Sequence, residues 1–138
     1  YLGNARDRPD LGKFQNFPVR ESDIEKPSAT IVIGDGRGSG HPHGLHSYKL
    51  DPPKLALSTG AIYFGNWKLA TIEQQHCPAE DRHSGKANIS FLDGHVKNMR
   101  LDELGYVVDE NGLIIANHPA GTNRLFTGTG QDDSGYKN

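Results

Sequence analysis

The sequence predicts a strand-dominated α+β domain, an antiparallel β-sheet with long loops, and such sheets usually hold about four to six strands. In residues 86–100 apolar and polar side chains alternate before an Asp-Gly pair, and in residues 106–115 two apolar runs flank an Asn-Gly turn. Both patterns predict β-hairpins. The 17 glycines and 8 prolines indicate that much of the rest forms turns and loops. We expect a single globular domain over residues 1–138.

The N-terminal half contains one clear strand signal. Residues 1–22 mix prolines, glycines and charges, and we expect them to be irregular. The segment 22–25 (Ser-Asp-Ile-Glu) predicts a capping box for one helical turn, which Pro27 would end. Residues 30–33 are all β-branched, which predicts a buried central strand. The Gly-, His- and Pro-rich residues 36–54 predict a long loop.

The other half adds further short elements around the two hairpins. Alternation over residues 61–67 predicts a strand, and residues 71–75 form either a helical turn or a loop. Residues 100–104 predict a short helical turn. From Asn117 onward the chain is rich in Gly, Asn and Asp, and the Leu-Phe pair at 125–126 is its apolar anchor.

Composition excludes several kinds of partner. The net charge of −2 gives no electrostatic basis for binding nucleic acid or an anionic membrane surface. No run approaches the roughly 18 apolar residues that a membrane-spanning helix requires. With one cysteine, Cys77, an intrachain disulfide is excluded. No signal peptide or initiator methionine is present, so we expect the chain to come from a longer gene product.

Four residues form a candidate metal site. Asp93 and His95 lie one residue apart and share a face of a strand, His83 lies at the foot of the same hairpin, and Asp35 ends the preceding strand. A mixed set of histidines and carboxylates suits Zn²⁺ or another divalent cation. The alternative is structural: His83 and His95 hydrogen-bond to the backbone, and Asp93 caps its own turn.

Other stretches also have a chemical and a structural interpretation. The three histidines within residues 41–46 either chelate a metal or belong to a solvated loop. Residues 109–111 (Asp-Glu-Asn) and 132–133 (Asp-Asp) either bind Ca²⁺ or form acidic turns in solvent. The aromatic residues within 63–67 either pack in the core or stack on a sugar or a subunit.

Catalytic chemistry has little support in the sequence. Cys77 follows His76, but adjacent side chains point apart and no third group is indicated. The glycine-rich residues 34–40 lack the lysine of a phosphate-binding loop and predict a flexible loop instead. We therefore assign no catalytic residue and expect that the chain is not an enzyme.

The residues from His83 to Val96 resemble a known motif, in which a histidine, nine residues and Asp-Gly are followed by His-Val, with Asn88 midway. The pattern is similar to the H-X9-DG domain of bacterial prepilin-like proteins, a group that resembles the pseudopilins of type II secretion. Residues 24–35 are similar to that family's "I-x-x-P-S-x-T" segment, which runs into a strand ending in Asp. Residues 125–133 are a third match.

The resemblance implies a structural subunit: the exported globular head of a prepilin-like or pseudopilin-like protein of a type II secretion or related filament system. It implies other pilin-like subunits as partners and an extracellular, cell-surface or periplasmic location. It also implies membrane attachment only through an N-terminal helix absent from this chain, and a Ca²⁺ loop near the end of the head. The pilin-like sheet would then expose an apolar face unless loops or a partner cover it.

An alternative from a different class is a small extracellular metal-dependent enzyme or a carbohydrate-binding module. It would use His83, Asp93 and His95, with Asp35 as a further ligand. A site open to a pocket favours an enzyme, whereas a closed site favours a structural cation.

Overall fold

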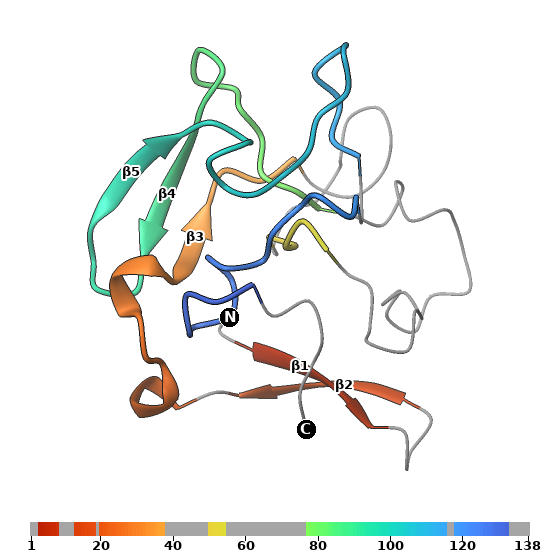
Figure 1. Cartoon of the computed structure of the whole chain (residues 1–138). Coiled ribbons are helices and arrows are strands. Elements are labelled where there is room, and N and C mark those ends of the chain that lie inside the picture. The colour runs from red at the N-terminus through yellow and green to blue at the C-terminus, as the bar shows by residue number, and fades with distance from the viewer. Residues whose placement is uncertain are drawn as a thin grey trace.

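The computed structural model of the chain describes residues 3–8, 13–18, 20–37, 50–54, 77–115 and 118–132. This part of the chain is strand-dominated, with two antiparallel sheets and two short 3-10 helices (Figure 1). The elements are β1 (Gly3–Arg8), β2 (Lys13–Pro18), η2 (Glu21–Asp23), η3 (Pro27–Ala29), β3 (Ile31–Gly34), β4 (Ala87–Phe91) and β5 (Val96–Met99). No α-helix occurs within the described ranges, and none of their helices has the length and apolarity needed to cross a membrane.

The N-terminal residues form a two-stranded sheet, so the prediction that residues 1–22 are irregular was wrong. Strand β1 pairs with β2 in antiparallel register, from Gly3 opposite Pro18 to Arg8 opposite Lys13. Because backbone hydrogen bonds hold such a ladder together, it does not require the apolar alternation by which strands are recognised in a sequence.

Strand β4 is the centre of the second sheet, whose order is β3-β4-β5. Ala87, Ile89 and Phe91 are buried, whereas Asn88 is exposed and Ser90 is half-buried. Alternating side chains point to opposite faces of a strand, so one face of β4 packs inward. The predicted strand and its orientation are confirmed.

The turn between β4 and β5 contains the predicted Asp-Gly pair. The Gly94 N–H donates to Phe91 O (2.9 Å), and the Phe91 N–H donates to His95 O (2.9 Å). Gly94 has φ +90°, a conformation that glycine adopts without the steric cost that a side chain adds. The hairpin predicted for residues 86–100 is therefore confirmed.

Strand β3 is at the edge of its sheet, which corrects the prediction of a buried central strand at residues 30–33. Within the strand Ile31 is buried, but Ile33 is 69% exposed. The register against β4 shifts between Ile31 and Ile33, as it does at a β-bulge, where one strand bends. A run of β-branched residues therefore predicted the strand but not its position in the sheet.

The core lies on the inner face of the second sheet. Its buried residues are Ile31, Ala79, Ala87, Ile89, Phe91, Leu101, Leu104 and Tyr106. Leu125 and Phe126 pack against this cluster, which confirms them as the apolar anchor of the C-terminal segment. In the described part of the chain, irregular segments thus cover the apolar face of the sheet, which is the alternative in which loops cover it.

The buried Tyr106 ties three irregular segments together. Its hydroxyl donates to Asp51 O (2.5 Å) and accepts the Ala79 N–H (3.3 Å), while its ring meets the Phe126 ring edge-on (6.3 Å between centroids). The Asp51 N–H donates to Cys77 O (2.8 Å), and Asp51 Oδ2 accepts the Cys77 N–H (2.9 Å). Burial raises the pKa of Tyr106, so the phenol remains a neutral hydrogen-bond donor.

Two single helical turns precede β3, but the predicted capping box does not form. Helix η2 begins after Arg20 without a side-chain cap, and the Ser22 hydroxyl lies 3.4 Å from Asp23 Oδ1 instead. Pro27 does not end this turn but opens η3, at a position where its missing N–H costs no helical hydrogen bond.

The remaining local predictions divide between confirmed turns and residues outside the described ranges. The Leu104 N–H donates to Arg100 O (3.2 Å), which confirms the helical turn. Val108 pairs with Ile114 in an antiparallel bridge, which confirms the hairpin predicted at 106–115. The strand predicted at 61–67, the element at 71–75 and residues 38–49 of the long loop lie outside the described residues.

We predict that Gly105→Ala severely destabilises the fold, by roughly 3 kcal/mol or more. Gly105 has φ +93°, and a Cβ atom there would lie 2.2 Å from the Thr122 carbonyl oxygen. Gly94→Ala is the matched control, because its φ is +90° but no atom lies within 4 Å of the added Cβ. The control should cost only about 1–2 kcal/mol. Urea unfolding of both variants measures the difference, and equal losses would contradict this account.

Candidate functional site

The first of the predicted site residues, Asp35, holds the end of β3 to the start of β4. Its Oδ2 atom accepts the Asn88 N–H (2.8 Å), and its own N–H donates to Asn88 O (3.1 Å). The same Oδ2 atom lies 3.2 Å from His83 Nε2, and Asp35 O accepts the Glu80 N–H (2.9 Å). The carboxylate therefore joins β3, β4 and the turn before β4.

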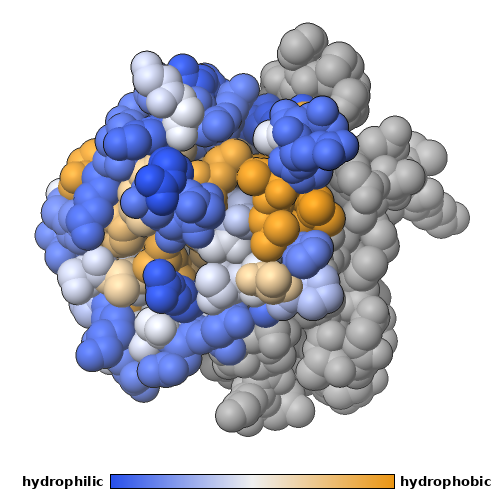
Figure 2. Space-filling model, turned by 45° about the horizontal axis from the view of Figure 1, so that its top comes forward, coloured by the Kyte–Doolittle hydropathy of each residue, from blue (hydrophilic) through white to orange (hydrophobic). Residues whose placement is uncertain are grey.

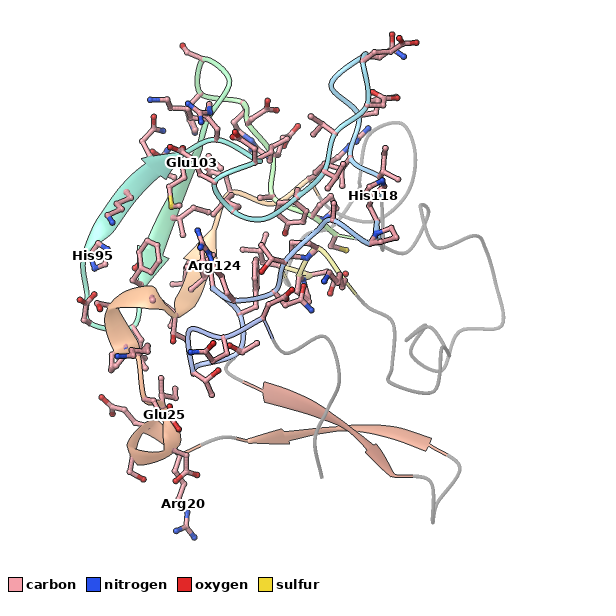
Figure 3. The ribbon with its side chains drawn as sticks, viewed as in Figure 1. Arg20, Glu25, His95, Glu103, His118 and Arg124 are labelled. Atoms are coloured by element: carbon pink, nitrogen blue, oxygen red, sulfur yellow. The ribbon has the colours of Figure 1, made fainter. Side chains whose placement is uncertain are left out.

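The second pair, Asp93 and His95, closes the turn between β4 and β5. Figure 3 shows His95 beside this turn. Asp93 Oδ1 lies 2.5 Å from His95 Nδ1 and also accepts the His95 N–H (3.2 Å). The hydrogen bond from His95 lowers the pKa of Asp93. The imidazole stacks on Phe91, with 4.4 Å between ring centroids and 5° between planes.

The other ring nitrogen of His95, Nε2, is buried and has no hydrogen-bond partner among the described residues. The turn is therefore braced through Nδ1 and the backbone N–H of His95, which both contact Asp93 Oδ1.

The structure separates the two pairs and does not form the predicted four-residue metal site. Asp35 bonds to Asn88, whereas His95 stacks on Phe91. These two strand positions are three residues apart, about 10 Å along the strand. No group of three or more His, Cys, Asp or Glu side chains converges in the described part of the chain.

The hairpin register explains this separation. Ser90 lies opposite Val96 and Ala87 lies opposite Met99. Each step toward the start of β4 is therefore matched by a step toward the end of β5. In that register His83 and His95 belong to opposite ends of the hairpin. The predicted four-residue site required these two ends to meet. A cation bound at one pair alone stays a prediction.

The carboxylates proposed as Ca²⁺ ligands instead accept protein hydrogen bonds. Asp109 Oδ1 accepts the N–H groups of Leu113 (2.8 Å) and Asn111 (2.9 Å), and the Leu113 hydrogen bond lowers the pKa of Asp109. Asp132 Oδ1 accepts the Asn123 N–H (2.8 Å), and its Oδ2 lies 3.1 Å from Lys54 Nζ. Both side chains therefore stabilise loops.

The pKa of Asp132 results from opposing effects. Burial raises it, but the Asn123 N–H and the Lys54 ammonium together outweigh burial, so the pKa is lowered. Asp133, the neighbouring candidate ligand, lies outside the described residues.

The other predicted sites are only partly visible. Cys77 is buried at 1% exposure, which does not suit a nucleophile, and its predicted neighbour His76 lies outside the described residues. So do the histidines of residues 41–46 and the aromatic residues within 63–67. At the start of the glycine-rich loop, Arg82 donates to Gly36 O (2.9 Å).

The sequence did not predict the row of exposed apolar and uncharged polar side chains on the outer face of the second sheet. Ile33, Ser90 and Val96 are paired across the three strands, and Ile33 and Val96 are 69% and 66% exposed. Beside this row the Asn98 amide donates to Asn88 Oδ1 (3.2 Å). The sequence contained a sign of this face in the polar residues of β4, which point outward. Residues paired with them on neighbouring strands must lie on the same face.

Exposed apolar residues also occur on the hairpin at 106–115, where Val108, Leu113 and Ile115 are 39–47% exposed. Figure 2 shows a largely hydrophilic surface that hydrophobic patches interrupt. Ile114 of the same hairpin packs on the core instead. The hairpin therefore has one anchored residue and a more exposed tip.

Comparison with known proteins adds no relative. No family model matches the chain, and neither the curated proteins nor the solved structures contain a significant match. Functional inference therefore depends on the motif residues and their placement in the fold.

We predict that Asp35→Ala lowers the free energy of unfolding by about 1–2 kcal/mol, because it removes the acceptor of the Asn88 N–H. His83→Ala is the matched control, since it removes only the contact between the exposed His83 ring and Asp35 and should cost less than about 1 kcal/mol. Urea unfolding measures both changes. A larger loss in the histidine variant would show that the histidine contact, not the backbone bond, is the brace.

We further predict that Asp93→Asn makes stability less sensitive to acid. In the folded state the pKa of Asp93 lies below its ordinary value of 3.8, so its ionised form stabilises the fold above that value. This stabilisation is lost as the pH falls through the folded pKa. Between about pH 6 and about pH 3, wild type should lose more stability than the variant.

Thermal unfolding over a pH series measures this difference. Glu25→Gln is the control, because Glu25 is an exposed carboxylate outside the turn (Figure 3). Parallel pH profiles for wild type and Asp93→Asn would show that the Asp93–His95 pair contributes nothing to stability.

Proposed function

We propose that the chain is the exported globular head of a prepilin-like or pseudopilin-like structural subunit, part of a type II secretion or related filament system. The observation that carries this proposal is the spatial arrangement of its motifs. The first of the three segments that resemble the family, residues 24–35, is hydrogen-bonded to each of the other two, residues 83–96 and 125–133, in the described part of the chain.

The first segment connects directly to the third. The Ile31 N–H donates to Leu125 O (2.9 Å), so the C-terminal segment covers part of the free edge of β3. The Lys26 N–H donates to Gly128 O (2.9 Å). Gly128 has φ +81°, and a Cβ added there would meet Ile24 at 3.6 Å. Residues about a hundred positions apart in the chain thus form one structural unit.

The first segment also connects to the second. The Leu92 N–H donates to Thr30 O (2.9 Å), and the Thr30 hydroxyl donates back to Lys26 O (2.7 Å). At the other end of β3, Asp35 bonds to Asn88 and His83. The residues of the first two segments therefore contact one another and form hydrogen bonds with backbone groups of both segments.

This pattern supports a structural role. In the described residues, the polar members of the motifs are used in braces and turn closures, and the paired carboxylates do not point at a shared pocket. A sequence signature whose parts hold each other in place is typical of a domain selected for its fold. In the proposal, its partners are other pilin-like subunits, and a helix preceding this chain attaches it to the membrane.

The alternative function has no specific observation in its favour. A metal-dependent enzyme or carbohydrate-binding module required His83, Asp93 and His95 to converge with Asp35. The two pairs lie at opposite ends of β4 instead. We therefore put forward the structural subunit alone, located at the cell surface, in the periplasm or outside the cell.

The proposal predicts what the gene encodes before Tyr1. Sequencing upstream should reveal an apolar helix of about 20 residues, which is the length that spans a bilayer, preceded by a prepilin-type cleavage site. Mass spectrometry of the protein from its native host should then find a processed, methylated N-terminus on that helix. An upstream reading frame without such a helix would overturn the proposal.

A further inference from the structure

The tip of the hairpin at 106–115 carries an exposed Asn111-Gly112 pair. We propose that Asn111 is a site of spontaneous deamidation and that Asp109 holds its reactivity down in the folded protein. This inference does not depend on the proposed function. It follows from the chemistry of the Asn-Gly pair and from four hydrogen bonds that surround it.

The reaction requires only the chain and water. The Gly112 backbone nitrogen loses its proton and bonds to Cγ of the Asn111 side chain. The bond from Cγ to the side-chain nitrogen breaks, and ammonia leaves, which closes a five-membered imide. Water then opens the imide at one of its two carbonyl carbons and produces aspartate or isoaspartate. Glycine favours the attack because no side chain obstructs its nitrogen.

The folded turn opposes this attack. The Gly112 N–H donates to Asp109 O (3.0 Å), so the attacking nitrogen is already engaged. Asp109 Oδ1 accepts the N–H groups on either side of Gly112, those of Asn111 (2.9 Å) and Leu113 (2.8 Å). The Asp109 N–H donates to Leu113 O (2.8 Å), which closes the turn. Rotating Asn111 onto the Gly112 nitrogen must break several of these bonds.

The charge of Asp109 acts in the same direction. The hydrogen bond from the Leu113 N–H lowers the pKa of Asp109, so the carboxylate is ionised at neutral pH. A negative charge beside the Gly112 N–H disfavours loss of its proton, which is the step that produces the nucleophile. Asp109 therefore restrains the reaction both by hydrogen bonding and by its charge.

The product would weaken the attachment of the hairpin. Isoaspartate inserts a methylene group into the backbone between positions 111 and 112, so the turn bonds of Asp109 can no longer all form. The bridge between Val108 and Ile114 is the next pairing beyond this turn, and Ile114 packs on the core. Deamidation also adds a negative charge beside Asp109 and Glu110. The modification thus releases the tip of the hairpin while the sheet remains.

The test measures deamidation at residue 111 in the intact chain by peptide mass spectrometry, during incubation at neutral pH. Wild type should react at least about tenfold more slowly when folded than when unfolded in urea, because each turn hydrogen bond contributes a factor of about five to the opening equilibrium. Asp109→Ala should remove most of this protection in the folded protein. Asp109→Asn keeps the acceptor oxygen but not the charge, and its rate should fall between those of wild type and Asp109→Ala.

Two controls make the result decisive. Peptides that contain Asn88 and Asn98 provide internal references, because neither residue precedes glycine. Gly112→Ala should slow the reaction in urea, which assigns it to the Gly112 nitrogen. Equal rates for folded and unfolded wild type would overturn the proposal, and this comparison requires no variant to fold. Equal rates for folded wild type and folded Asp109→Ala would also overturn it.

Discussion

One carboxylate, that of Asp35, joins three segments of the described residues at the point where they meet. It accepts a backbone N–H from β4 and lies 3.2 Å from a histidine nitrogen of the preceding turn, while its own backbone bonds to β4 and to Glu80. Because β3 is a short edge strand, its ladder alone gives few hydrogen bonds. A charged acceptor at its end adds stronger ones, since hydrogen bonds to ionised groups exceed neutral ones.

A second group of bonds, centred on Tyr106, supports the other side of the core. Its hydroxyl is buried, so the partners on Asp51 and Ala79 are needed to offset the cost of removing it from water. Together the two centres replace what a long helix does in many domains. Irregular segments, fixed by side chain to backbone hydrogen bonds, cover the apolar face of a small sheet.

The sequence predicted the parts of the fold that local rules determine. The alternation in β4, the Asp-Gly and Asn-Gly turns and the Leu125-Phe126 anchor depend on neighbouring residues, and each was correct. The position of β3 in the sheet depends on distant pairing, which a run of β-branched residues does not encode. The hairpin register, which sequence spacing does not encode either, places the two pairs of predicted site residues at opposite ends of β4.

The reciprocal bonds between Asp51 and Cys77 have a consequence for the order in which the chain can fold. They join residues that are 26 positions apart in the chain, and the Arg37 N–H, bonded to Pro78 O (2.9 Å), joins a third position at the same place. Bringing distant positions together costs loop-closure entropy before any contact repays it. We therefore expect these contacts to form after the β4–β5 hairpin, whose strands are neighbours in the sequence.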